Sequence, residues 1–342
     1  MLMINKIIRC DMSFDATKKM SSKEFWETTK RKKYREKADV FASSLIDDNT
    51  GLVFKEFSLY RKCPLCSSDN VDVLFVKMGF PYVRCKECDM VYNNPSLNED
   101  KNTDMYENAI HTDEYLSILT ANNQRLHDEN KFNYGLDIAK KHCEDLHNVL
   151  DVGCSIGVFL ETAMQRGLEA YGLELNQKAY EYAQNKQLNV DNNPLGQSIF
   201  SDISFDLITL WDVLEHIVDP KILLKQIYDR LNAGGALLIL TPNVNSLAAR
   251  ILHEKCNVFE GWAHVSLFSV ETLRQVLEES GFEVVHIETI LAEVNVINNH
   301  LDYQHPYLGD VHSPESVLSL LSETDILNKN LGYKSMALAI KR

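Results

Sequence analysis

The chain has 342 residues, and its 45% hydrophobic and 25% charged content is that of an ordinary globular protein with a sizeable core. Its 35 basic and 49 acidic side chains give a net charge of −14, which disfavours nucleic acid as a partner because phosphate neutralisation dominates that affinity. No apolar run reaches the roughly 18 residues of a membrane-spanning helix, and no secretory signal opens the chain, so we expect a cytoplasmic protein without a membrane span.

Residues 1–51 are polar with helical patterning and predict an N-terminal helical extension. Their basic run, Lys30 to Lys33 with Arg35, is explained more simply as a solvated helix face than as a nucleic-acid patch. Over residues 52–98 the pattern changes to short β-type runs. These runs are Leu52 to Phe57, Val71 to Val76, and Tyr82 to Val83, and Asn93-Asn94-Pro95 closes the segment as a turn.

Two C-x-x-C pairs interrupt these strands, and 18 residues separate the pairs. Each pair can hold a metal ion from a tight turn, and together they supply the tetrahedral Cys₄ shell that zinc prefers. The alternatives are four reduced thiols without metal, an iron–sulfur centre or a redox pair. A closed Cys₄ shell leaves no open coordination position, so the sequence predicts a structural zinc module over residues 52–98. Its ligands are Cys63, Cys66, Cys85 and Cys88.

Residues 99–146 return to helical patterning and predict a helical connector or lid. Over residues 147–342 strands and helices alternate, which predicts an α/β fold with a doubly wound, mostly parallel, Rossmann-like sheet. A helix-poor stretch, about 291 to 330, is expected between the last two strands. The expected strands are 149–152, 170–173, 207–210, 236–240, 282–287 and 335–340, and the expected helices are 158–166, 177–185, 220–231 and 270–280.

A glycine-containing loop follows the strand at 149–152, in the sequence Asp-Val-Gly-Cys-Ser-Ile-Gly from Asp151 to Gly157. Gly153 and Gly157 allow a sharp turn and a close approach of backbone to a ligand at a helix N-terminus. The glycine spacing is not that of a dinucleotide-binding loop. Glu174 ends the next strand, where an acid can accept hydrogen bonds from both ribose hydroxyls, and a polar and aromatic segment, Trp211 to His216, ends another.

These motifs resemble those of class I S-adenosylmethionine-dependent methyltransferases, over roughly residues 146–290 and the last strand. The resemblance implies that the glycine loop holds the methionine part of the cofactor and that Glu174 holds the ribose. Thr241-Pro242-Asn243 and His264 with Leu267-Phe268-Ser269 match later motifs, whereas Ser155 stands where many members have glycine. The implied cofactor-binding residues are Asp151, Gly153, Cys154, Ser155, Gly157, Glu174, Leu175, Trp211 and Asp212.

The order of a cysteine module, then C-x-x-C-x-M-V-Y-x-N-P, then this core resembles bacterial methyltransferases that act on sugars, often nucleotide-linked ones. The resemblance implies a small-molecule acceptor, and we expect methylation of a sugar hydroxyl. A C-methyltransferase of a nucleotide-linked deoxysugar is one alternative. Others are an RNA- or protein-directed methyltransferase that grips its substrate with the zinc module, and a non-catalytic binding protein with a relic cofactor site.

A hydroxyl acceptor must lose its proton as its oxygen attacks, and a histidine is the usual base near neutral pH. His264 is the candidate general base because it follows the strand at 236–240 and should face the acceptor, and its pKa is expected near the unperturbed value of about 6.5. His216 is a second candidate, although it could simply anchor the Asp219-Pro220 turn. Both histidines could instead be packing residues.

The histidines also belong to a possible second metal site. Asp212-x-x-Glu215-His216 with the later His264 resembles the E-x-x-E-H…H arrangement of small-RNA 2′-O-methyltransferases, and its first part also occurs in ubiquinone-pathway O-methyltransferases. The resemblance implies a divalent ion that binds the acceptor hydroxyls, and carboxylate and imidazole ligands would suit Mg²⁺ or Mn²⁺. Here aspartate replaces the first glutamate, and L-E-H is also widespread in methyltransferases without metal.

Overall fold

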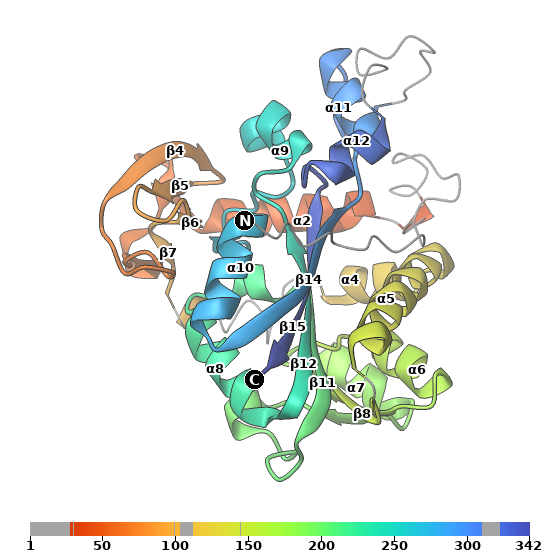
Figure 1. Ribbon diagram of the computed structural model, residues 1–342. Coiled ribbons are helices and arrows are strands. Elements are labelled where there is room, and N and C mark those ends of the chain that lie inside the picture. The colour runs from red at the N-terminus through yellow and green to blue at the C-terminus, as the bar shows by residue number, and fades with distance from the viewer. Residues whose placement is uncertain (1–27, 30, 99, 103–111, 144, 310–321) are drawn as a thin grey trace.

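The computed structural model describes residues 28–29, 31–98, 100–102, 112–143, 145–309 and 322–342. Its centre is a seven-stranded sheet with helices on both faces (Figure 1). In spatial order the strands are β10 (Asn189–Asp191), β9 (Glu169–Leu173), β8 (Asn148–Val152), β11 (Phe205–Trp211), β12 (Leu231–Pro242), β15 (Lys334–Lys341) and β14 (Phe282–Ile290). The fold class predicted from the sequence, a doubly wound and mostly parallel α/β sheet, is confirmed.

The strand directions bring the candidate site to one edge of this sheet. The strands from β10 to β12 pair in parallel, and β15 runs antiparallel between β12 and β14. The carboxyl ends of β8, β9, β11, β12 and β14 therefore meet the amino end of β15 at the same edge. In open α/β sheets, ligands bind at this edge, where loops rather than side chains of a neighbouring layer cover the strand ends.

Alternating strand residues supply two hydrophobic cores. Leu237 and Ile239 pack with α8 (Pro220–Arg230) and α10 (Val270–Glu279), whereas Leu238 and Leu240 pack with α5 (Asn122–His142), α6 (Val158–Gln165) and other residues on the opposite face. Helix α7 (Gln177–Asn185) belongs to this second face. Such two-sided burial explains why the strands read as near-continuous apolar runs.

The cysteine module forms a small antiparallel sheet of its own, on the left in Figure 1. It contains β4 (Val71–Lys77), β5 (Phe80–Cys85) and β6 (Val91–Asn93), and β13 (Ser266–Leu267) joins it at β6. Two short pairs accompany the sheet: β1 (Ile46–Asp47) with β2 (Leu52–Val53), and β3 (Ser58–Leu59) with β7 (Ser96–Leu97).

The interior of the module is continuous with the main core. Cys63, Cys85 and Tyr92 belong to the same buried cluster as Leu273 and Val276 of α10. Strand β13, which lies between β12 and α10 in the chain, completes the module's sheet, so the module is built into the molecule rather than attached by a linker.

Four expectations about secondary structure need correction or addition. The run Leu52 to Phe57 is a strand only at β2, because residues 55–57 turn into a 3₁₀ helix. The stretch 291–330 contains α11 (Val294–Leu301) and α12 (Glu323–Asn328) and is therefore not helix-poor in its described parts. Strand β10 was not predicted, because three residues are too few to show the alternation of apolar and polar side chains that marks a strand. Strand β12 begins at Leu231, so the helix before it ends one residue earlier than expected.

The remaining helices lie near the site edge of the sheet. They are α2 (Arg31–Ser44), α4 (Thr112–Leu119) and α9 (Leu247–Leu252). Of the basic run, Arg35 lies 3.0 Å from a Glu260 oxygen and Lys33 lies 3.2 Å from Glu114, while Lys30 and the expected helix over residues 1–27 fall outside the described residues. In the described parts of the chain, no helix is long and apolar enough to cross a bilayer.

Candidate functional site

A cavity of about 950 Å³ lies at the carboxyl edge of the sheet. Its volume is that of a site for a cofactor together with a small acceptor. The glycine loop, the end of β9 and the end of β11 line one part of it, and α2, α4, α5 and the segment after β14 line the rest. Among the residues implied by the resemblance, the lining residues are Asp151, Gly153, Cys154, Ser155, Glu174, Leu175, Trp211, Asp212 and His216.

The loop after β8 turns tightly because three of its residues have positive φ. Gly153 has φ 82°, Ser155 φ 50° and Gly157 φ 80°, so the serine pays a backbone strain of about 1 kcal/mol or more that glycine would avoid. A Cβ atom added to Gly153 would lie 2.7 Å from Val213 Cγ2. The close approach of Val213, together with the positive φ, therefore restricts this position to glycine. Gly157 itself does not line the cavity; it begins α6.

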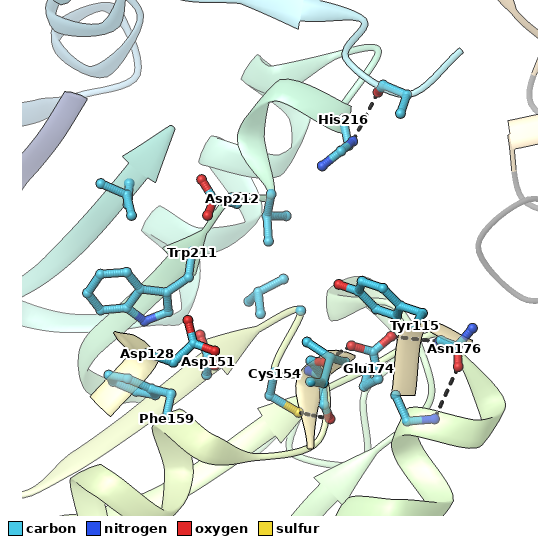
Figure 2. Close-up of a pocket in the computed structure, with 18 of the residues that line it drawn as sticks. Tyr115, Asp128, Asp151, Cys154, Phe159, Glu174, Asn176, Trp211, Asp212 and His216 are labelled. Atoms are coloured by element: carbon cyan, nitrogen blue, oxygen red, sulfur yellow. Dashed lines mark hydrogen bonds between the residues drawn. The ribbon is translucent and has the colours of Figure 1, made fainter. Parts of the chain in front are cut away.

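Glu174 is oriented by the loop that it faces. One carboxylate oxygen accepts a hydrogen bond from the Ser155 backbone N–H at 2.7 Å, and the other accepts one from the Asn176 N–H at 2.7 Å. Burial raises the pKa of this carboxyl despite those two donors. Each oxygen keeps a free lone pair for a ligand hydroxyl. Tyr115 of α4 lies on the other side of the Glu174 carboxylate (Figure 2).

Two further polar groups near the loop have no protein partner among the described residues. The Trp211 Nε1–H and the Ser155 hydroxyl are buried and make no hydrogen bond. Asp151 is 2% exposed and accepts a hydrogen bond from Thr209 Oγ1 at 2.7 Å, and burial raises its pKa to about 8. Buried donors without partners are uncommon, so these residues fit a polar ligand in the cavity.

His216 and His264 lie together, with ring centroids 5.0 Å apart. His216 Nδ1 lies 3.0 Å from the Ala263 carbonyl oxygen, and His264 Nδ1 lies 2.7 Å from the Val258 carbonyl oxygen. Because a carbonyl only accepts, Nδ1 of each ring must carry the proton, and each Nε2 presents a lone pair. Figure 2 shows His216 with one ring nitrogen on a backbone carbonyl and the other toward the cavity.

The structure corrects three expectations about these histidines. His264 does not line the cavity, because its bond to the Val258 carbonyl holds the ring behind His216. The turn at Asp219 is capped by Asp219 itself, which accepts from the Ile222 N–H at the start of α8, while Nδ1 of His216 lies on the Ala263 carbonyl oxygen. Neither pKa lies near 6.5: burial, above all, lowers the pKa of His216 and of His264 to about 4 each.

Glu215, His216 and His264 each present a ligand atom within 4.8 Å of the others, but Asp212 is not part of this group. Asp212 Oδ1 accepts a hydrogen bond from Lys334 at 2.5 Å, and its other oxygen lies 3.9 Å from Lys131. Glu215 accepts from Thr241 Oγ1 at 3.0 Å, and burial raises its pKa to about 8. The four-residue set expected from the sequence is therefore a three-residue set.

The acceptor side of the cavity includes residues that sequence reasoning missed. Glu293 lies at the start of α11 in the left-handed region, with φ 49° and ψ 32°, and lines the cavity. Its Oε2 atom is buried without a hydrogen-bond partner among the described residues, and burial raises its pKa to about 8. Tyr307, Tyr333 and Lys334 line the same wall. A single sequence carries no motif for these positions: Glu293 and Tyr307 come from the stretch expected to be helix-poor, and Tyr333 and Lys334 lie just before and at the start of β15.

The four module cysteines converge at one point. Cys63 Sγ lies 3.5 Å from Cys88 Sγ, and Cys66 Sγ lies 3.4 Å from Cys85 Sγ. All four sulfurs lie within 4.8 Å of one another. Four Zn–S bonds of about 2.3 Å in a tetrahedron separate the sulfurs by about 3.8 Å, so this donor set fits zinc.

A comparison with known protein families finds a match for the part of the chain that contains the glycine loop. Residues 120–287 match the family model described as "Methyltransferase domain". The chain carries a methyltransferase domain. The matched residues include the loop after β8 and Glu174, the parts of the sequence that predicted a methyltransferase.

Curated relatives are similar to about a third of the chain. The chain is 30% identical over 119 residues to the ubiquinone biosynthesis O-methyltransferase of Idiomarina loihiensis, covering 32% of this chain and 49% of that protein. It is 31% identical over 104 residues to the enzyme of the same name from Coxiella burnetii, covering 29% of this chain and 44% of that one. The chain thus spans about half the length of the curated relatives it matches.

Solved structures give weaker similarity. The magnesium protoporphyrin IX methyltransferase of Synechocystis PCC 6803, solved with bound S-adenosylhomocysteine, matches with a TM-score of 0.47 and 14% identity, covering 72% of this chain and 100% of that one. A methyltransferase from Clostridium acetobutylicum matches with a TM-score of 0.46 and 12% identity, covering 67% and 98%.

Proposed function

We propose that this protein transfers a methyl group from S-adenosylmethionine to a hydroxyl of a small, sugar-containing acceptor. The observation that carries the proposal is the meeting of two parts in one cavity. The glycine loop and the oriented Glu174 carboxylate line the same cavity as His216, whose Nδ1 lies on the Ala263 carbonyl oxygen so that Nε2 is the nitrogen able to accept a proton. The first part suits a nucleoside cofactor, and the second suits an acceptor that must lose a proton.

The cofactor supplies an activated methyl group on its sulfonium. In this proposal Glu174 holds the ribose hydroxyls, and the backbone of Gly153 to Ser155 lies along the methionine part. Asp151 and the free Trp211 N–H bind polar atoms of that part, while Leu175 covers the nucleoside. Asp212, whose carboxylate accepts a hydrogen bond from Lys334, lies between the cofactor part and the acceptor part of the cavity.

His216 takes the acceptor proton at Nε2 in this proposal, and His264 supports it from behind. The Ala263 carbonyl fixes the His216 tautomer, so that Nε2 is always the accepting nitrogen. The charge that the ring gains is stabilised by Asp212 and Glu260, whose carboxylates favour protonated His216. The protein thereby contributes orientation, exclusion of water and a place for the proton.

Two lines support a hydroxyl acceptor. The relatives from Idiomarina loihiensis and Coxiella burnetii are named as O-methyltransferases, although their names place them in ubiquinone biosynthesis. The cysteine module ahead of the domain resembles that of sugar methyltransferases. The aromatic and carboxyl groups on the acceptor wall, including Trp262, Tyr333 and Glu293, suit a ligand with both apolar faces and hydroxyls.

A screen of acceptors tests the proposal. Purified protein with S-adenosylmethionine is offered nucleotide-linked sugars, nucleotide-linked deoxysugars and catechol-type phenols, and S-adenosylhomocysteine release is measured. We expect release with a nucleotide-linked sugar, and mass spectrometry and NMR of the product should place the methyl group on oxygen. A methyl group on carbon would support the deoxysugar C-methyltransferase instead. Release with phenols alone would replace the sugar by a ring hydroxyl.

Replacement of Glu174 should weaken the cofactor site specifically. Glu174→Ala removes both ribose acceptors, so calorimetry should show S-adenosylmethionine affinity lower by about 1–3 kcal/mol. Glu169→Ala is the matched control, because that glutamate lies at the opposite end of β9. Equal affinity of wild type and Glu174→Ala would refute the ribose role.

Replacement of Glu293 should affect the acceptor alone. Its raised pKa, about 8 through burial, leaves the carboxyl protonated at pH 7, where it can donate to and accept from a neutral hydroxyl. Glu293→Leu should raise the acceptor KM about 10–100-fold, the cost of one or two lost hydrogen bonds, whereas Glu293→Gln should raise it only a few-fold. Equal damage by glutamine would show that the charge matters and would indicate a cationic acceptor.

A second candidate mechanism is metal-assisted. The group of Glu215, His216 and His264 favours it, because two imidazoles with one carboxylate form a facial donor set for a divalent ion. Chelation should then abolish methyl transfer, and Mg²⁺ or Mn²⁺ alone should restore it. Activity that survives a chelator while the Cys₄ metal stays bound would leave His216 acting as a base.

A further inference from the structure

The segment that carries His264 is fastened to the cysteine module. The Tyr82 hydroxyl donates to the His264 carbonyl oxygen at 2.9 Å, and Asn93 Nδ2 donates to the Gly261 carbonyl oxygen at 2.6 Å. The Asn93 backbone N–H donates to the Val265 carbonyl, and β13 then pairs with β6. The backbone on both sides of His264 therefore belongs to the module's hydrogen-bond network.

Arg61 of the module joins the two histidine segments. Its Nη1 donates to the Val218 carbonyl oxygen at 2.5 Å, and its Nη2 donates to the Val265 carbonyl oxygen. Both nitrogens lie 3.4 Å from Ser266 Oγ, which itself donates to the Ile217 carbonyl oxygen at 2.8 Å. Val218 follows His216 by two residues, and Val265 follows His264 directly. One guanidinium is thus hydrogen-bonded to the backbone that follows each of the two histidines.

The surroundings of the Arg61 side chain restrict where its charged group can lie. The Arg61 guanidinium lies 5.2 Å from the centre of the Tyr92 ring. A buried cation is costly unless its donors are matched. Backbone carbonyls of the two segments accept from Nη1 and Nη2, while Nε is buried without a partner among the described residues, and a guanidinium can reach both segments because its donors form a planar fork.

The cysteines in turn hold Arg61. Cys63 follows it by two residues, and the Asn94 side chain binds both the Arg61 N–H at 3.1 Å and the Arg61 carbonyl at 3.0 Å. A metal in the Cys₄ site would tie the loop of Cys63 and Cys66 to the turn that contains Cys85, at the end of β5. The position of Arg61 relative to β6 therefore depends on the cysteines.

We propose that Arg61 is a positioning residue that holds His216 and His264 against each other, and that metal in the Cys₄ site holds Arg61. The module is then a wall of the methyl-transfer site and couples metal content to the geometry of the histidine pair. The hydrogen bonds of Arg61 do not depend on which reaction the protein catalyses. The inference rests on the proposed function only for the roles of His216 and His264.

Hydrogen exchange of the full-length zinc-loaded protein tests this inference. The amide of Val265 donates to the Glu215 carbonyl oxygen at 2.8 Å and reports the joining of the segments. In Arg61→Ala, exchange over residues 261–268 should be about tenfold faster or more, with zinc content and S-adenosylmethionine affinity unchanged. Chelator-treated wild-type protein, studied at low temperature, should show the same acceleration. Arg61→Lys should restore part of the protection because it keeps one donor.

Arg230→Ala is the matched control. Arg230 also donates to two backbone carbonyls, those of Phe200 and Ser201, and lies 5.9 Å from the Phe205 ring, but it is remote from the histidines. It should leave exchange over 261–268 unchanged. Wild-type exchange in either Arg61→Ala or the zinc-free protein would overturn the inference, as would equal acceleration in Arg230→Ala.

The same variants separate this inference from the proposed function. Accelerated exchange without methyl transfer to any acceptor would leave the inference standing and the proposed function failed. Normal exchange in Arg61→Ala, with a wild-type protein that transfers methyl groups, would leave the proposed function standing and the inference failed. With an acceptor in hand, Arg61→Ala should lower kcat more than it changes either KM.

Discussion

Alanine in place of His216 is expected to lower turnover by about 10²–10⁴-fold, which is the usual contribution of a positioned general base. His216 lies on the cavity wall, as His127 also does, and its Nδ1 lies on the Ala263 carbonyl oxygen, so the substitution removes the Nε2 to which the proposal assigns the acceptor proton. S-adenosylmethionine affinity should change little, because Glu174 and the glycine loop are untouched. The measurement is kcat with saturating cofactor and acceptor.

His264→Ala discriminates between the two arrangements of the pair. If His216 is the base, His264→Ala should lower kcat less than His216→Ala does, since the ring behind is lost but the proton acceptor remains. The larger loss in His264→Ala would restore His264 as the base. His147→Ala, an exposed histidine at the opposite edge of the sheet, is the control and should be silent.

The pH profile gives a second test of the same proposal. A base works when deprotonated, so the rate rises with pH through its pKa and then levels off. With the pKa lowered by burial to about 4 for His216, kcat/KM should be flat between about pH 5.5 and 7, below the range in which the Glu293 carboxyl, with a pKa raised by burial to about 8, ionises. An inflection near about 6.5 would indicate an unperturbed, solvated histidine instead.

The parts of the site that follow strand ends could be predicted from the sequence. Asp151, Glu174 and Trp211 each end an apolar run in a regular β–α alternation, and parallel strands necessarily bring their carboxyl ends to one edge. The paired cysteines could be predicted for a similar reason, since ligand spacing is a local property of the chain.

What could not be predicted depends on tertiary contacts. Which histidine faces the cavity is decided by the Val258 and Ala263 carbonyls, and their positions depend on β13 joining the module. The histidine pKa values follow from burial, which periodicity does not reveal. Glu293 lies in a left-handed backbone conformation that few non-glycine residues adopt, so no propensity argument would have placed it on the acceptor wall.

Loss of the Cys₄ site should have the largest effect on stability. In Cys63→Ser, Cys85→Ser the zinc content should fall from about one per chain to nearly none, because two thiolates cannot complete a tetrahedral shell. Structural zinc contributes folding free energy directly, on the order of 10 kcal/mol in small peptides. Here hydrophobic packing also holds the module, so we expect a loss of about 5 kcal/mol and a Tm lower by about 5–10 °C.

The shared core determines the form of the unfolding transition. Cys63 is 2% exposed and Cys85 is fully buried, within the cluster that includes Leu273 and Val276 of α10. A module on a linker would unfold in a separate transition. Here loss of the metal should instead lower the Tm of one transition in which the whole chain unfolds. Cys143→Ser is the matched control, since that buried cysteine packs on the opposite face without a metal, and it should cost only about 1–3 kcal/mol. Undiminished zinc in the double variant, or a Tm loss no larger than that of Cys143→Ser, would show that the four cysteines hold no structural metal.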